Sequence, residues 1–100
     1  MKKVINGKMY DTDTAKCVAS WSDGYPGDLD YCSESLSRKR TGEFFIYGDG
    51  GPRSPYSLTR GSEICGDCAI IPYSEAEARL WVEEHCDGDK YVEIFGAVEE

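Results

Sequence analysis

Two cysteines, Cys65 and Cys68, stand two residues apart in the stretch "ICGDCAIIPYS" of this 100-residue chain. This C-x-x-C spacing lets two thiolates hold one tetrahedral ion from a tight turn, and Gly66 supplies a permissive backbone between them. A closed structural zinc site takes four protein ligands. The pair therefore predicts half of a structural zinc site, with two further ligands to come from elsewhere in the chain.

The further ligands are expected among the three other cysteines and the one histidine. Cys86 follows a predicted helix, and Cys17 lies in a predicted strand that should pack against this helix. Cys32 lies inside a predicted hairpin strand, where a small buried residue fits. We therefore expect Cys32 in the core and one zinc ion held by Cys17, Cys65, Cys68 and Cys86. Cys32 or His85 could replace Cys17 or Cys86 in this set. Such an ion would join strand, turn and helix and contribute on the order of 10 kcal/mol to folding.

Other chemistry for these side chains stays open. A C-x-x-C pair can be a redox pair, but thioredoxin-type pairs stand at a helix N-terminus, and here the extended stretch "AIIP" follows. Simple burial of all five cysteines is a third interpretation. His85 is expected as a packed or capping histidine, with a zinc ligand or a general base as alternatives. The glycine-rich "GDGGPRS" lacks the G-K-S/T ending of a phosphate loop, and no catalytic triad is apparent, so we expect no enzyme.

The cysteine count and the first residues bear on the compartment. Five cysteines are an odd number, which argues against a complete disulfide framework. The opening "MKKVINGKMYD" has no apolar run long enough for a signal peptide, and no stretch of the sequence is long and apolar enough to span a membrane. We therefore expect a protein of the reducing cytoplasm, where structural disulfides are rare.

The length of the chain predicts one domain over residues 1–100, and local patterns predict its strands and helices. Asn6-Gly7 between two short β-like runs predicts a hairpin. Alternation over 15–22 predicts a strand with Cys17, Ala19 and Trp21 on one face. The runs 29–39 and 43–48 predict a second hairpin with its turn at 40–43, and 69–72 predicts a short strand. The Gly-, Pro- and Ser-rich stretch 48–63 is expected to be a loop.

A helix is predicted from Ser74 to about Cys86. Ser74 and Glu77 form a capping-box pattern, and an apolar face follows at i, i+3, i+4, i+7: Ala78, Trp81, Val82 and His85. Leu80 falls on the opposite side, which predicts either a second cover or a small apolar patch. One or two further turns should end at Gly96. The predicted fold is α+β, with a small antiparallel sheet of four to five strands, a C-terminal helix, a short second helix and a structural zinc site.

The charge is concentrated near the C-terminus. The net charge is −8, and residues 75–100 hold nine acidic side chains against Arg79 and Lys90. Such a field repels nucleic acid and favours a basic partner. The alternative interpretation is a solvated acidic helix that keeps a small protein soluble.

Three stretches together resemble a family of small proteins carried by phages and integrative elements of Gram-positive bacteria: "KVINGKMYDTDTAKCVASW", "YCSESLSRKRTGEFFIYGDGGPRSPYS" and "IIPYSEAEARLWVEEHCDGDKYVEIFG". The resemblance covers nearly the whole chain. Several members of such families resemble anti-CRISPR proteins, which bind the RNA-guided DNA nuclease of type II systems. Among these, the chain is most similar to a zinc-carrying inhibitor. It implies a sheet-and-helix scaffold without a catalytic site. The C-G-D-C segment departs from the family pattern, in which Cys32 belongs to the sheet.

The resemblance and the charge together predict a non-catalytic inhibitor that works by occupying a basic surface of the nuclease. Docking is expected through an acidic helix face made of Glu77, Glu83, Glu84, Asp87, Asp89 and Glu93. The protein is expected to act as a monomer in the host cytoplasm, without direct contact with nucleic acid or membrane. Two other functions stay open. One is a binding module for another host or mobile-element protein, and the other is a thiol redox or metal-handling protein that uses Cys65 and Cys68.

Overall fold

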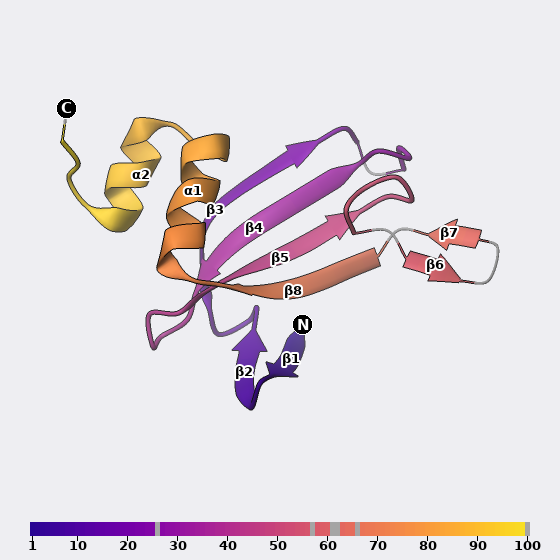
Figure 1. The fold of residues 1–100 in the computed structure, drawn as a ribbon, viewed down its shortest axis with the longest axis horizontal. Coiled ribbons are helices and arrows are strands. Elements are labelled where there is room, and N and C mark those ends of the chain that lie inside the picture. Colours follow the sequence, from indigo (N-terminus) through magenta and orange to yellow (C-terminus); the bar gives the residue numbers. More distant parts are fainter. Residues whose placement is uncertain (26, 57, 61–62, 66, 100) are drawn as a thin grey trace.

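A four-stranded antiparallel sheet forms the centre of the molecule in a computed structural model that describes residues 1–25, 27–56, 58–60, 63–65 and 67–99 (Figure 1). The strand order is β3-β4-β5-β8. Their bounds are β3 Lys16–Asp23, β4 Cys32–Arg38, β5 Phe44–Gly50 and β8 Asp67–Tyr73. The β4–β5 hairpin confirms the prediction: Gly42 takes φ 95° in its turn, a conformation that glycine adopts readily.

Two small hairpins are separate from this sheet. The first pairs β1 (Lys2–Ile5) with β2 (Lys8–Asp11), as Asn6-Gly7 predicts, and both turn residues take positive φ (52° and 76°). The second pairs β6 (Leu58–Arg60), inside the stretch 48–63 predicted to be a loop, with β7 (Glu63–Cys65) at the end of that stretch. Figure 1 shows β6 and β7 beyond one end of the large sheet and the first hairpin below it.

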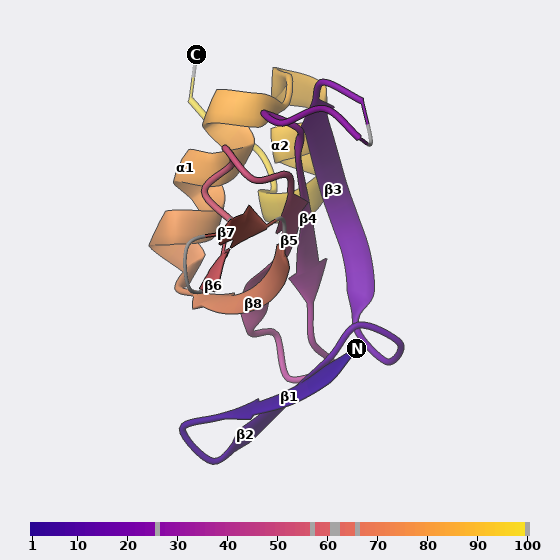
Figure 2. The same cartoon turned by 90° about the vertical axis from the view of Figure 1, so that its right-hand side faces the viewer.

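The two predicted helices are present and lie together on one face of the sheet (Figure 2). Helix α1 spans Glu75–His85 and begins with the predicted capping box: the Glu77 amide donates to Ser74 Oγ at 3.1 Å and the Ser74 amide to Glu77 Oε1 at 2.9 Å. Helix α2 spans Gly88–Phe95 and ends at Gly96, whose φ is 97°. The short link between the helices holds the N-cap of α2, Asp87, which accepts from the Lys90 amide at 2.9 Å.

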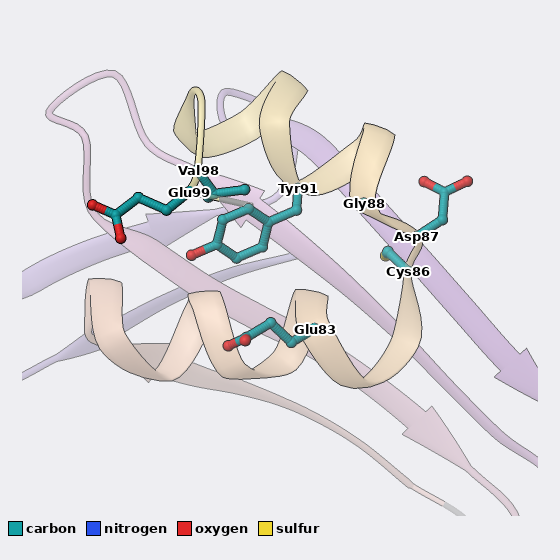
Figure 3. A pocket seen from close by; sticks show the side chains of 7 residues that line it. All are labelled: Glu83, Cys86, Asp87, Gly88, Tyr91, Val98 and Glu99. Atoms are coloured by element: carbon teal, nitrogen blue, oxygen red, sulfur yellow. The ribbon is translucent and has the colours of Figure 1, made fainter.

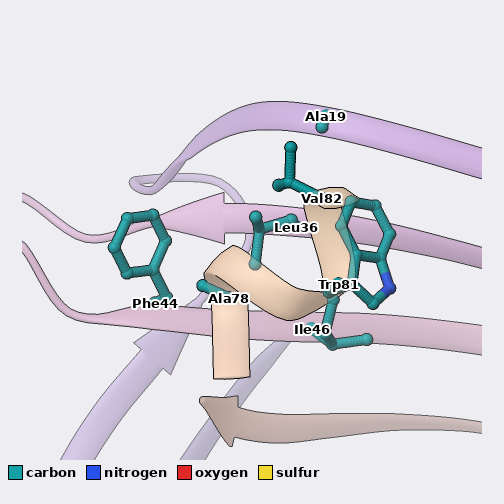
Figure 4. Close-up of a cluster of buried hydrophobic side chains, with 7 residues drawn as sticks. All are labelled: Ala19, Leu36, Phe44, Ile46, Ala78, Trp81 and Val82. Atoms are coloured by element: carbon teal, nitrogen blue, oxygen red, sulfur yellow. The ribbon is translucent and has the colours of Figure 1, made fainter. Parts of the chain in front are cut away.

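The main core lies between this sheet face and α1. It joins Ala19, Leu36, Phe44 and Ile46 of the sheet to Ala78, Trp81 and Val82 of the helix (Figure 4). The apolar spacing in the sequence thus identified the buried side of α1 correctly. On the other sheet face, Tyr10 of the first hairpin packs against Phe45 and Ile70, with the Tyr10 and Phe45 rings edge to face at 5.5 Å. The structure confirms an α+β fold with a four-stranded antiparallel sheet and two helices.

The structure differs from the sequence prediction at two sheet edges. The pairing of β3 with β4 shifts between Cys17 and Ala19, so that Val18 packs against the main core while Cys17 is exposed. The prediction that Cys17 shares the inner face with Ala19 and Trp21 is therefore wrong at Cys17. Strand β8 also starts earlier than expected and includes Cys68. Cys68 therefore belongs to a regular strand in the structure rather than to a compact turn.

Candidate functional site

The structure separates two of the four predicted zinc ligands, Cys17 and Cys68. Cys17 is level with Ser37, Phe45 and Pro72 across the sheet, whereas Cys68 pairs with Asp49, four residues further along. Three strand spacings of about 4.8 Å and four residues of about 3.3 Å separate the two backbones by roughly 19 Å. Two sulfurs on one zinc ion lie within about 4.6 Å of each other. Cys17 and Cys68 therefore cannot share an ion in this fold.

The remaining cysteines divide in the same way. Cys86 caps the end of α1 and lines one hollow together with Cys17, so these two thiols belong to the helix end of the molecule. The Cys65 side chain lies outside the described residues. Among the residues that are described, no group of three or more His, Cys, Asp or Glu side chains is placed to hold a metal ion.

Cys32 and His85 occupy packed positions. Cys32 is buried, as predicted for a core residue, and burial followed by Glu34 raises the pKa of its thiol. The His85 ring stacks on Trp21 with ring centres 4.3 Å apart and planes 8° from parallel, and its centre lies 5.0 Å from that of Trp81. His85 is thus part of an aromatic contact between α1 and β3, in agreement with the packed interpretation.

A carboxylate that the sequence analysis did not single out holds α1 on the sheet. Glu34 Oε1 accepts hydrogen bonds from both indole nitrogens, Trp21 Nε1 at 2.8 Å and Trp81 Nε1 at 3.2 Å. Glu34 Oε2 accepts from the Tyr56 hydroxyl, and burial together with this bond raises the pKa of Tyr56. Glu34 therefore ties β3, α1 and the segment after β5 to one point. The sequence did contain a signal for this role. Glu34 alternates with Cys32 and Leu36 along the strand, so a charged residue stands on the same side as two buried ones.

The six acidic residues predicted to bind a partner are all exposed, but they do not form one face. Glu83 and Asp87 line a groove between α1 and α2, with a volume of about 470 Å³, which we call the interhelix groove (Figure 3). Its other lining residues are Cys86, Gly88, Tyr91, Val98 and Glu99. Glu77 and Glu84 instead line a hollow of about 220 Å³ between α1 and the end of β8, which we call the α1 hollow. The acidic residues are therefore spread over separate hollows, because Glu93 lines a further one together with Lys16 and Arg38.

Four of these six residues also have partners within the chain, and one of them is Glu84, whose Oε2 lies 3.9 Å from His85 Nε2. Glu77 closes the capping box of α1, Asp87 caps α2, and Glu93 lies 3.1 Å from Lys90 Nζ. Such exposed pairs are weak, so they reduce the negative field without abolishing it. Among the described residues, no Lys or Arg lies within 4.0 Å of the carboxylates of Glu83, Glu84 or Asp89. These three carry the acidic character of the helical surface most fully.

The two hollows also contain apolar and aromatic side chains that the charge pattern did not reveal. Leu80 is 61% exposed at the α1 hollow, beside Tyr73 and Trp81, and confirms the predicted apolar patch on α1. Val98 is 56% exposed at the interhelix groove, where Tyr91 forms part of the wall. Aromatic side chains are enriched at the centre of protein interfaces, and the rim of an interface is polar.

The thiol at the interhelix groove is not set up as a nucleophile. Burial raises the pKa of the Cys86 thiol; Lys90 opposes this shift and Asp87 adds to it. A raised pKa leaves less thiolate at neutral pH, and the thiolate is the reactive form. Cys86 is therefore suited to packing at the end of α1 rather than to redox chemistry.

Neither helix of the described chain has the length and apolar character needed to cross a membrane. Comparison of the chain with protein-family models, with curated proteins and with solved structures finds no match.

Proposed function

We propose that this protein is a non-catalytic inhibitor that docks its acidic helical surface onto a basic surface of a type II RNA-guided DNA nuclease. The observation that carries the proposal is the exposure of all six acidic residues on and between α1 and α2: Glu77, Glu83, Glu84, Asp87, Asp89 and Glu93. The choice of nuclease rests on the sequence resemblance to anti-CRISPR proteins described above.

Binding rather than catalysis accounts for the composition of the two hollows. Each combines carboxylates with one exposed apolar and one half-buried aromatic side chain, Leu80 and Tyr73 in one, Val98 and Tyr91 in the other. Charge complementarity speeds association, while buried aromatic and apolar contacts supply much of the affinity. An RNA-guided nuclease holds its guide–target duplex in a positively charged channel, which offers a surface of the required sign.

In this proposal the protein acts in the cytoplasm of the bacterial host, as a monomer and without touching nucleic acid. It occupies the basic surface and so prevents loading of guide or target DNA. The attachment of α1 to the sheet through Glu34 favours this mode, because a preorganised surface loses little conformational freedom on binding.

Plasmid cleavage by a purified type II nuclease and its guide RNA, with and without the protein, tests this function. We expect cleavage to be inhibited, and the inhibition to weaken as salt screens the acidic surface. The double charge reversal Glu83→Lys/Glu84→Lys should weaken inhibition about tenfold or more, since each removes an attractive contact and adds a repulsive one.

The matched control is Asp13→Lys/Asp49→Lys, which changes the net charge equally at two exposed residues outside the helices. It should leave inhibition close to wild type. Unaltered cleavage in the presence of wild-type protein would reject the inhibitory function. Equal effects of the two double variants would reject docking through the helical surface. A pull-down that recovers a different host protein would favour the more general binding module.

A structural zinc ion held by the C-x-x-C pair, Cys65 and Cys68, is a separate part of the proposal. Its support is the spacing of Cys65 and Cys68, which suits two thiolates on one tetrahedral ion. The proposal leaves out Cys17, which lies far from Cys68 in the sheet register, and Cys86, which lines a hollow together with Cys17.

A further inference from the structure

The α1 hollow has the size and lining of a receptor for one long side chain. Its walls are Tyr73 at the end of β8 and, on α1, Glu77, Leu80, Trp81 and Glu84. Glu77, Trp81 and Glu84 follow i, i+4, i+7, so they share one side of the helix, with Leu80 beside them. The volume of about 220 Å³ suits one side chain rather than a helix or a strand.

The charge of the hollow selects a cation. Glu77 and Glu84 stand one helical turn on either side of Trp81, so a charge placed over this residue would face two carboxylates. Burial raises the pKa of Tyr73, and the nearby carboxylates of Glu34, Glu77 and Glu84 raise it further. Arg79, the only arginine of α1, is engaged elsewhere: it binds Glu75 at 3.2 Å and the Tyr91 hydroxyl at 3.1 Å.

Aromatic and apolar walls favour arginine over lysine. The guanidinium group is planar, stacks on aromatic rings and pairs with carboxylates through two parallel hydrogen bonds. Tyr73 offers an aromatic wall, and the 61% exposed Leu80 offers an apolar surface for the methylene stem. A lysine would use the charge but would gain less from the rings, because its ammonium is compact and strongly hydrated.

We propose that the α1 hollow binds one arginine side chain of the partner protein, held between Glu77 and Glu84 over Tyr73 and Leu80, with the buried Trp81 beneath them. This inference rests on the proposed function, since it names the chemistry by which one part of the acidic surface recognises its basic target. In this proposal the α1 hollow makes the specific contact with the partner, whereas the interhelix groove contributes general charge attraction.

The probe is a nine-residue Gly/Ser peptide with a single central arginine, titrated into ¹⁵N-labelled protein and followed by NMR. A peptide with citrulline in place of arginine has the same shape without the charge. We expect shifts centred on Tyr73, Leu80 and the Trp81 indole N–H with the arginine peptide, and weaker binding of the citrulline peptide by about fivefold or more. Equal binding of both peptides, or shifts centred on Tyr91 and Val98, would overturn the proposal.

Substitutions distinguish binding at the α1 hollow from general attraction by the negative charge of the protein. Glu84→Gln should weaken binding of the arginine peptide about fivefold, and Glu77→Gln should weaken it similarly while glutamine keeps the capping box. The matched control is Asp13→Asn, which removes the same charge at an exposed residue outside the helices. An equal loss in Asp13→Asn would overturn the proposal.

The peptide titration and the cleavage assay fail independently. If the arginine peptide binds at the α1 hollow but the nuclease is not inhibited, the arginine site stands and the choice of partner is wrong. If the nuclease is inhibited but the peptide does not bind at the α1 hollow, the inhibitory function stands and the arginine site is rejected.

Discussion

The Tyr56 ring lies directly over Gly48, so closely that a β-carbon at position 48 would stand 1.9 Å from the ring Cζ. Only a residue without a side chain leaves room for Tyr56 to reach Glu34 across strand β5. We expect Gly48→Ala to lower the free energy of unfolding by about 1–3 kcal/mol, because the ring must move and its hydrogen bond is strained or lost.

Urea unfolding followed by tryptophan fluorescence measures this effect. Gly88→Ala is the matched control, because a β-carbon at position 88, in the first turn of α2, meets no atom within 4 Å. It should leave stability unchanged or slightly higher. A Gly48→Ala protein as stable as wild type would show that Tyr56 does not depend on this contact.

Replacement of the Glu34 carboxylate should loosen α1 from the sheet. Glutamine keeps the size of the side chain but has one acceptor oxygen in place of two charged ones, while Trp21, Trp81 and Tyr56 all donate to it. We expect Glu34→Gln to cost roughly 1.5–3 kcal/mol, the range for hydrogen bonds to a charged group. Near-ultraviolet circular dichroism should report altered packing of the indoles. Glu83→Gln, which removes a charge from the exposed side of α1, should change neither stability nor this spectrum.

Stability should decline in alkali. The pKa of Tyr56 is raised in the folded protein, by burial first and then by its bond to Glu34, and burial also raises the pKa of Cys32 and Tyr73. The unfolded chain therefore releases these protons at lower pH than the folded chain, so unfolding becomes easier as the pH rises. The free energy of unfolding should hold its full contribution from these groups below about pH 8.5 and fall between about pH 9 and 11.

The Tyr56→Phe variant isolates one of these groups. It removes the phenol and so should show a shallower alkaline decline than wild type, though a lower stability at neutral pH. Urea midpoints measured from pH 7 to 11 give both quantities. Parallel declines in the two proteins would show that Tyr56 is not responsible for the alkaline loss.

Zinc binding should depend on one pair of cysteines and not on the other. Protein purified in reductant is expected to hold about one zinc ion per chain, and Cys65→Ser/Cys68→Ser should remove it. Cys17→Ser/Cys86→Ser should keep the metal, because Cys17 lies at the other end of the sheet from Cys68. Elemental analysis and a melting curve with chelator measure the result. Metal-free wild-type protein would reject the zinc site, and loss of zinc from both variants would contradict the sheet register.

Local signals in the sequence were sufficient for most of the fold. Asn6-Gly7, the capping box at Ser74 and the apolar spacing of α1 each depend on contacts within a few residues, and the structure confirms all three. The two faces of β5 also follow its alternation, with Phe44 and Ile46 in the main core and Phe45 and Tyr47 on the other side. These features follow from periodicity and backbone preference, which neighbouring residues determine.

The separation of Cys17 from Cys68 could not be predicted from the sequence, because it depends on the register of the sheet. Cys17 and Cys68 lie on the two edge strands at different levels of the sheet, and neither strand order nor level is encoded near either residue. The extra residue between Cys17 and Ala19 also removed Cys17 from the inner face, and a one-residue shift of this kind leaves no clear mark on the local pattern. Glu34 was missed for the related reason that its three donors come from distant segments.

The two ends of the chain lie on different sides of the sheet: the first strand runs below it, whereas the last residues pass beside the helices (Figure 1). Val98 and Glu99 are themselves part of the interhelix groove. An affinity tag or fluorescent fusion joined after Glu100 would therefore crowd the surface under test, while one placed before Met1 would leave it clear. Assays of any binding partner are best built on the N-terminal fusion.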